Sequence, residues 1–190
     1  MEAYITAQAI GIVAMCSNVI SYLFKDKRNV LLCQLIGSSL FTVNMFMLGA
    51  TIGALLNIVA IFRALVYMNR DKIKINSSVL CSFFVIIYLL SYVLSFTVFG
   101  KEPTLKNLIT ELLPVIGMTA FTVGMNGKEA KEIRIFAFIN SPCWLIYNCV
   151  NFTLGGILCE VFSLISNGTA FILYDLKAIK SKRAEEKTNA

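Results

Sequence analysis

Two carboxylates stand inside long uncharged stretches of the sequence, where a charge is costly and therefore informative. Glu111 follows Lys106 by five residues, and Glu160 is the one charged residue between Arg134 and Asp175. At membrane depth an ionised side chain costs a few kcal/mol, so each carboxylate is a functional candidate. Either could carry a proton, contact a hydroxyl or amine of a solute, or pair with a neighbouring amide.

The residue types that are missing limit the chemistry further. The sequence contains no histidine, which excludes imidazole catalysis, histidine proton relays and histidine metal sites. Its six cysteines are scattered through apolar runs without metal-ligand spacing. Neither a nucleophile–base pair nor a phosphate-binding loop is visible. We therefore expect no enzyme activity, no metal site and no cofactor.

A third ionisable group, Arg63, is expected in the inner third of a membrane helix. Its long side chain could reach the cytoplasmic lipid headgroups by snorkelling, which would be a structural role. It could also face the protein interior as a functional group. The sequence leaves both alternatives open.

A tryptophan and an amide follow a proline within one apolar run. Trp144 and Asn148 are four residues apart and share a helix face, and an aromatic wall beside an amide suits a polar ligand. Pro142 and Pro114 permit kinks and are candidate hinges. Other polar residues recur at helical spacing, where they could line a cavity or simply hold helices together. The candidate substrate-binding residues are Asn44, Asn57, Glu111, Trp144, Asn148, Glu160, Ser163 and Asn167.

The elements that must position these residues are membrane-spanning helices. The chain is 57% apolar and 15% charged, with a mean hydropathy of +0.75, and a soluble domain of this length could not bury so much apolar surface. A span needs about 20 mostly apolar residues. Seven are expected: one at 3–24, two within 29–62 separated by a turn at 48–51, and one each at 75–100, 107–125, 133–151 and 155–176, with a second tight turn at 151–156.

The distribution of positive charge predicts the orientation in the membrane. Of the 17 lysines and arginines, only Lys101 and Lys106 fall in a loop on the predicted outer side, and nearly all others fall in loops on the opposite side. Cytoplasmic loops carry the excess of positive charge. We therefore expect the N-terminus outside and the C-terminus in the cytoplasm, with a basic tail against anionic headgroups.

The two halves of the sequence align when one is shifted by 103 residues. Under this shift Gln8 matches Glu111, Asn57 matches Glu160, and charged loops coincide. The prediction is an all-α membrane protein with two parallel three-helix repeats joined by a linker helix, a 3+1+3 arrangement. Transporters are commonly built from such repeats, with the site between them. The predicted bounds are 1–74 for repeat 1, 75–104 for the linker, 105–177 for repeat 2 and 178–190 for the tail.

Several short runs resemble a known family. They are the Glu-Leu-Leu-Pro-Val-Ile-Gly run at 111–117, the polar run from Gly155 to Gly168, and the opening at 7–11. Together they resemble the YgjV family of bacterial inner-membrane proteins over almost the whole length. The resemblance implies a location in the cytoplasmic membrane but no substrate. The repeat plan is similar to SWEET sugar carriers, PQ-loop amino-acid carriers and nicotinamide riboside carriers. The chain lacks the Pro-Gln pair and the first-repeat prolines of the first two groups, which argues against carrying over their specificity.

These observations favour a facilitator or proton-coupled carrier of a small polar metabolite, working by alternating access between two three-helix bundles. The alternative is a non-transporting membrane module, a receptor or accessory subunit, with a dry and packed centre. Membrane lipids and an unknown small polar solute are the expected partners, and nucleic acid is not. Self-association into a homo-oligomer stays open.

Overall fold

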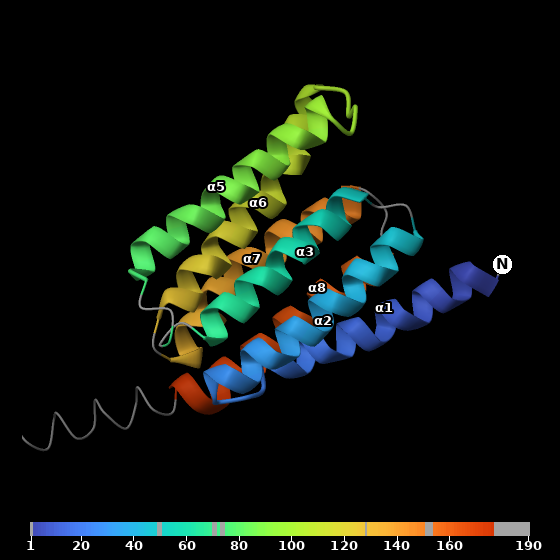
Figure 1. Ribbon diagram of the computed structural model, residues 1–190. Coiled ribbons are helices and arrows are strands. Elements are labelled where there is room, and N and C mark those ends of the chain that lie inside the picture. The colour runs from blue at the N-terminus through green and yellow to red at the C-terminus, as the bar shows by residue number, and fades with distance from the viewer. Residues whose placement is uncertain are drawn as a thin grey trace, which may run out of the picture.

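The computed structural model describes residues 2–48, 51–69, 72, 75–127, 129–150 and 154–176. The predicted tail at 178–190 lies outside these ranges, as do residues 49–50 of the first predicted outer turn and residues 151–153 of the second. The described residues form helices and no strand (Figure 1). The helices are α1 (Glu2–Ser21), α2 (Lys27–Met47), α3 (Thr51–Met68), α5 (Ser77–Thr97), α6 (Leu105–Asn126), α7 (Ala130–Val150), α8 (Leu154–Ala170) and the π-helix η1 (Phe171–Leu176).

Polar residues fix where several helices begin. Asp26 accepts a hydrogen bond from the backbone N–H of Arg28 and starts α2. Asn76 caps α5, and Thr104 caps α6 by accepting from the backbone N–H of Asn107. Such caps satisfy backbone donors that have no partner inside the helix. They explain why the apolar runs become helices with sharp starts.

In the described part of the chain, six helices are long and apolar enough to cross a membrane. They are α1, α2, α5, α6, α7 and α8 with the start of η1. The apolar part of α3 is shorter, at 53–68, and it contains Arg63. The predicted division of 29–62 into two helices is confirmed, because α2 ends at Met47 and α3 begins at Thr51.

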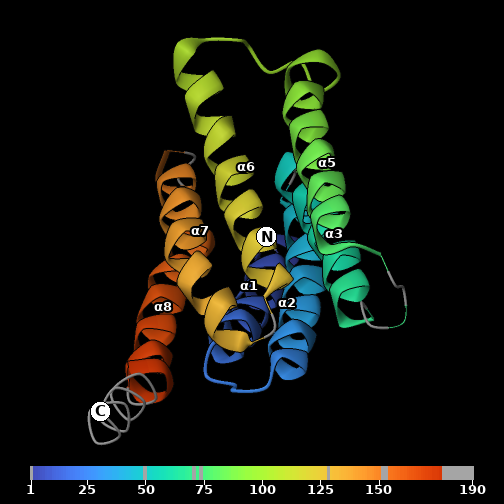
Figure 2. The same cartoon turned by 90° about the vertical axis from the view of Figure 1, so that its left-hand side faces the viewer.

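The helices surround a common centre. α1, α2 and α3 pack side by side in sequence order, and so do α6, α7 and α8; α3 then contacts α6, and α8 contacts α1, which closes a ring. α5 lies outside the ring against α6 and α3 (Figure 2). This arrangement leaves the interior of the ring to be lined by six helices.

The helix boundaries keep a constant spacing between the halves. α6, α7 and α8 begin at residues 105, 130 and 154, each 103 residues after the first residue of α1, α2 and α3, which are residues 2, 27 and 51. α5 occupies the region that was predicted to link the halves. The start of α1 and the end of η1 lie at opposite ends of the molecule (Figure 1).

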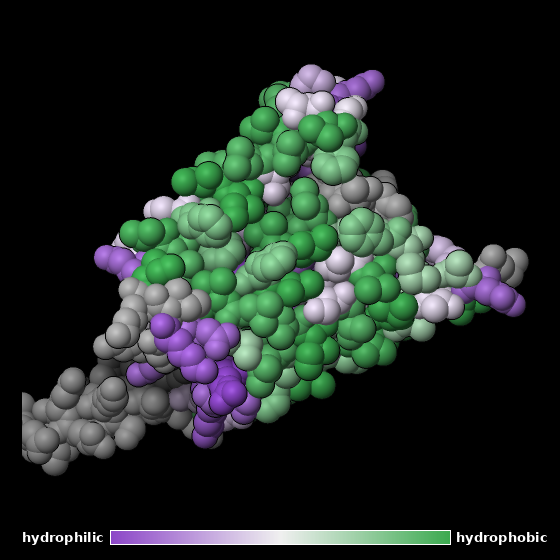
Figure 3. Space-filling view, viewed as in Figure 1, coloured by the Kyte–Doolittle hydropathy of each residue, from purple (hydrophilic) through white to green (hydrophobic). Residues whose placement is uncertain are grey.

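The distribution of polarity is that of a membrane protein. Large apolar side chains cover the flank of the helices, and hydrophilic residues gather at their ends (Figure 3). Ile5, Phe62 and Ile86 are each more than half exposed, whereas Arg63 is 4% and Asn148 is 3% exposed. Lipid accounts for the apolar exterior, and the buried polar groups must find their partners inside the protein.

Candidate functional site

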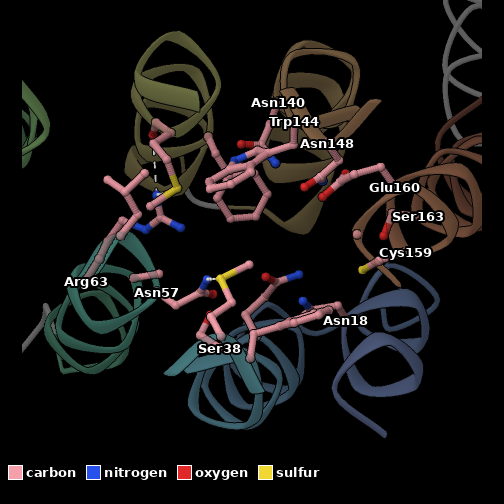
Figure 4. A pocket seen from close by; sticks show the side chains of 18 of the residues that line it. Asn18, Ser38, Asn57, Arg63, Asn140, Trp144, Asn148, Cys159, Glu160 and Ser163 are labelled. Carbon is pink, nitrogen blue, oxygen red and sulfur yellow. Dashed lines mark hydrogen bonds between the residues drawn. The ribbon is translucent and has the colours of Figure 1, made fainter. Parts of the chain in front are cut away.

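A cavity of about 80 Å³ lies inside the ring (Figure 4). It is partly enclosed, and the described part of the chain contributes to its wall from both halves but not from α5. The lining residues are Asn18, Tyr22, Gln34, Ser38, Phe41, Met45, Leu56, Asn57, Ala60, Arg63, Met118, Phe121, Asn140, Trp144, Asn148, Gly156, Cys159, Glu160 and Ser163.

Helical periodicity directs these side chains inward. On α7 the lining residues Asn140, Trp144 and Asn148 are four residues apart, which places them on one face. On α2 the lining face runs from Gln34 to Met45. Eleven residues at 1.5 Å each make this lining stretch of α2 about 16 Å long. Side chains from several helical turns therefore contribute to the cavity wall.

Glu160 is the one carboxylate among the lining residues that the structure describes. It points toward Asn148 from α8 (Figure 4), and Ser141 lies beside its carboxyl group. The approach of α7 to α8 depends on Gly156, because a Cβ there would lie 2.6 Å from Cγ of Asn148. Trp144 extends this wall and meets Tyr147 edge to face at 5.6 Å between ring centroids.

The opposite half repeats this arrangement with different residues. Asn57 on α3 donates to the backbone carbonyl of Gly53 at 2.9 Å and contacts the sulfur of Met45 at 3.4 Å. A Cβ on Gly53 would lie 2.5 Å from that sulfur. Met45, Gly53 and Asn57 precede Asn148, Gly156 and Glu160 by 103 residues each. The two walls therefore share their geometry and differ in charge.

Arg63 faces the interior and does not snorkel. Its Nη1 donates to the Tyr88 hydroxyl at 3.0 Å, to Oγ1 of Thr122 at 3.1 Å and to the backbone carbonyl of Met118 at 3.3 Å. The guanidinium carbon lies 5.0 Å from the ring centroid of Phe121, a cation–π distance. The sequence left open whether this side chain reaches the lipid headgroups or faces the protein interior, and in the structure it faces the interior.

Three buried polar atoms of residues that line the cavity have no hydrogen-bond partner among the described residues. They are Nε of Arg63, Oδ1 of Asn18 and Oδ1 of Asn140. The two amide oxygens lie at helix contacts, that of Asn18 against Gly37 and that of Asn140 against Gly117. Leaving a buried donor such as Nε of Arg63 unpaired costs about 1–3 kcal/mol. A polar molecule that paired with this group would offset the cost, which makes the cavity a candidate binding site.

The structure brings together five of the eight predicted substrate-binding residues. Asn57, Trp144, Asn148, Glu160 and Ser163 line the cavity. Each belongs to α3, α7 or α8, as the periodicity predicted.

The other three predicted residues lie outside the cavity wall and have other partners. Nδ2 of Asn44 donates to the backbone carbonyl of Ala7 at 2.6 Å. Nδ2 of Asn167 donates to the backbone carbonyl of Arg134 at 2.8 Å. Glu111, in the N-terminal third of α6, forms an ion pair with Lys101. All three connect neighbouring helices or loops.

Sequence reasoning overlooked two amides and undervalued one cation. Asn18, Asn140 and Arg63 all line the cavity. Asn18 is the one amide between Gln8 and the first loop, so it belonged to no polar stripe. Its isolation in an apolar helix was itself the available signal.

The two predicted hinges sit inside continuous helices. Pro114 lies within α6 and is buried, and Pro142 lies within α7. Each removes one backbone hydrogen bond from its helix. Their role in bending stays a prediction.

Comparisons with known proteins place the chain in a family. A family model described as a bacterial inner membrane protein, Imp-YgjV, matches residues 5–177. The chain is 24% identical over 177 residues to the inner membrane protein YgjV of Escherichia coli K12, which covers 92% of this chain and 87% of that relative. No solved structure matches it. With its apolar helices, the chain is a multi-pass bacterial inner membrane protein that belongs to the YgjV family.

Proposed function

We propose that the protein is a carrier of a small polar metabolite, either a facilitator or proton-coupled, and not an enzyme. The observation that carries this proposal is the cavity between α1–α3 and α6–α8, which polar side chains from both halves line and which Arg63, with its unpaired Nε, borders. A non-transporting module is expected to have a dry, packed centre, and a cavity lined by polar side chains disfavours that alternative. Ligand sites are typically concave, with a few convergent polar groups.

Equivalent contacts at the two junctions of the ring support a 3+1+3 repeat. Arg63 on α3 donates to Thr122 on α6, and Ser166 on α8 donates to the backbone carbonyl of Val19 on α1 at 2.6 Å. Arg63 and Ser166 are 103 residues apart, and so are Val19 and Thr122. The halves therefore meet through the same helix positions, as expected for repeats related by an axis along the membrane normal.

In the proposed mechanism α1–α3 form one bundle and α6–α8 the other, and the two bundles rock about the cavity. The proposal counts seven membrane spans, with α3 as one of them. At one end of the helices, Nζ of Lys27 donates to the backbone carbonyls of Met125 (2.7 Å) and Gly127, and Nη1 of Arg134 donates to that of Phe24 at 3.1 Å. Each contact joins one half to the end of the first helix of the other half or to the loop that follows it. Positive charge predicts this end to be cytoplasmic, so the two contacts serve as an inner gate.

A thermal-unfolding screen of detergent-purified protein against sugars, nucleosides, vitamins and amino acids tests the proposal. A ligand present at 100 times its dissociation constant stabilises the native state by about 2.7 kcal/mol, which such a screen detects. Asn148→Ala should abolish the shift. Asn44→Ala, a matched amide outside the cavity wall, should lower the unfolding temperature but keep the shift. A dry centre predicts no shift for any solute.

A further inference from the structure

A basic side chain and a carboxyl group face each other across the cavity without forming an ion pair. Of the described lining residues, Arg63 is the one basic side chain and Glu160 the one carboxylic acid. They come from α3 and α8 and approach from opposite sides (Figure 4). The ion pair found among the described residues joins Lys101 to Glu111, so Arg63 and Glu160 are not paired with each other. Isolated charges in a membrane interior mark functional sites.

One side of the Arg63 guanidinium is hydrogen-bonded within the protein, whereas Nε on another side is not. Nη1 is held by Tyr88, Thr122 and Met118, which fixes the plane of the group. Nε is buried and has no acceptor among the described residues. Two N–H groups on one edge of a guanidinium match the two oxygens of a carboxylate. Arg63 is therefore preorganised for an anionic group.

Glu160 offers the complementary environment on the other side. Its neighbours Ser141 and Asn148 are uncharged, and Trp144 from the same helix as Asn148 adds an aromatic face. A carboxylate and an aromatic face together favour an ammonium group. An ammonium group here would pair with the ionised form of Glu160.

On this basis, and resting on the carrier function above, we propose that the solute is a small zwitterion, with its carboxylate at Arg63 and its ammonium group at Glu160. The cavity of about 80 Å³ has room for about six water molecules at ~10–15 Å³ each. That is the size of a solute with about six non-hydrogen atoms. A simple anion would leave Glu160 uncompensated, and a simple cation would leave Arg63 uncompensated.

The test uses probes that differ only in charged groups. Binding of glycine, L-alanine and β-alanine to the full-length protein is measured by calorimetry beside propionate, ethylamine and glycerol, which lack one or both charges. The proposal expects at least one zwitterion to bind at least tenfold more tightly than the three other probes. Failure of all three zwitterions to bind would overturn it.

Variants test which side chain binds each charged group of the solute. Glu160→Gln should weaken binding of the zwitterion at least tenfold and reduce the ratio of its affinity to that of propionate. Glu132→Gln, at the start of α7, should change neither the affinity nor the ratio. Arg63→Lys, which keeps the positive charge, should bind the zwitterion more tightly than Arg63→Gln does. If Arg63→Gln does not fold, the result for Glu160→Gln decides whether the proposal holds. Zwitterion binding unchanged in Glu160→Gln would overturn the inference. If glycerol binds and Trp144→Ala abolishes that binding, the carrier function stands but the zwitterion proposal is overturned. If no solute binds or is transported, both the carrier function and the zwitterion proposal are overturned.

Discussion

The amide of Asn148 lies directly against Gly156, at the point where α7 and α8 cross beside the cavity. A Cβ on Gly156 would come within 2.6 Å of Cγ of Asn148. Met45 lies against Gly53 in the same way in the other half. Because both glycines let a neighbouring side chain into the space beside the cavity, small changes there should alter the site.

Gly156→Ala should displace Asn148 and weaken solute binding at least tenfold. Overpacking at such a contact costs about 1–3 kcal/mol of stability. Gly168→Ala on the same helix is the matched control, because a Cβ there meets nothing within 4 Å, and alanine is the better helix former by up to about 1 kcal/mol. Calorimetric binding and thermal unfolding of both variants check this. Equal effects of the two substitutions would argue against a role for the Asn148 contact.

Lys101→Met should destabilise the protein by about 1–3 kcal/mol. Glu111 is 2% exposed at its side chain and would lose its partner; the cost stays moderate because Lys101 is 24% exposed and solvent screens part of the pair. The double variant Lys101→Met/Glu111→Gln should recover most of the loss. Denaturant titration in detergent measures both. Solute affinity should not change in either variant, since Glu111 lies outside the cavity wall.

Removing the inner gate should open the cavity to the cytoplasm. Cys159 lines the cavity and is 3% exposed, so it reports access when the other cysteines are replaced by serine. Lys27→Met/Arg134→Met should raise its labelling by a membrane-impermeant thiol reagent in inside-out vesicles several-fold. Labelling from the outer side should rise less. An unchanged labelling rate on the cytoplasmic side would show that these contacts do not gate the cavity.

The predicted orientation has a direct test. A fluorescent protein fused to the C-terminus should fluoresce, because that end is expected in the cytoplasm. Alkaline phosphatase fused after Glu102, between α5 and α6, should be active, because that loop is expected outside. The reverse pattern would contradict the orientation and move the proposed gate to the outer face.

The positions of the helices could be predicted from the sequence, because long apolar runs in a membrane leave the backbone few alternatives. Even the division of 29–62 near Gly49 followed from length. The choice among polar residues was harder. Asn44, Asn148 and Asn167 all sit on polar stripes, yet a stripe faces both the cavity and the neighbouring helices, and only packing assigns each amide.

Long-range packing also decided the position of Arg63. Its partners Tyr88 and Thr122 lie on α5 and α6, 25 and 59 residues away in the sequence. No local pattern around Arg63 indicates those contacts. The isolated amide Asn18 was overlooked for a related reason, since a single polar residue gives no periodicity to detect. Asn140 did have such a signal, because it precedes Trp144 and Asn148 by four and eight residues on one helix face.

Uptake into proteoliposomes tests the carrier function most directly. Liposomes containing the wild-type protein, Asn148→Ala or Asn44→Ala, and empty liposomes, are supplied with labelled amino acids, sugars, nucleosides and vitamins. If the protein is a carrier, at least one small solute should enter liposomes that contain the wild-type or Asn44→Ala protein faster than it enters liposomes with Asn148→Ala or empty liposomes. If wild-type protein that is folded in the liposomes admits none of these solutes faster than empty liposomes do, the carrier function is contradicted.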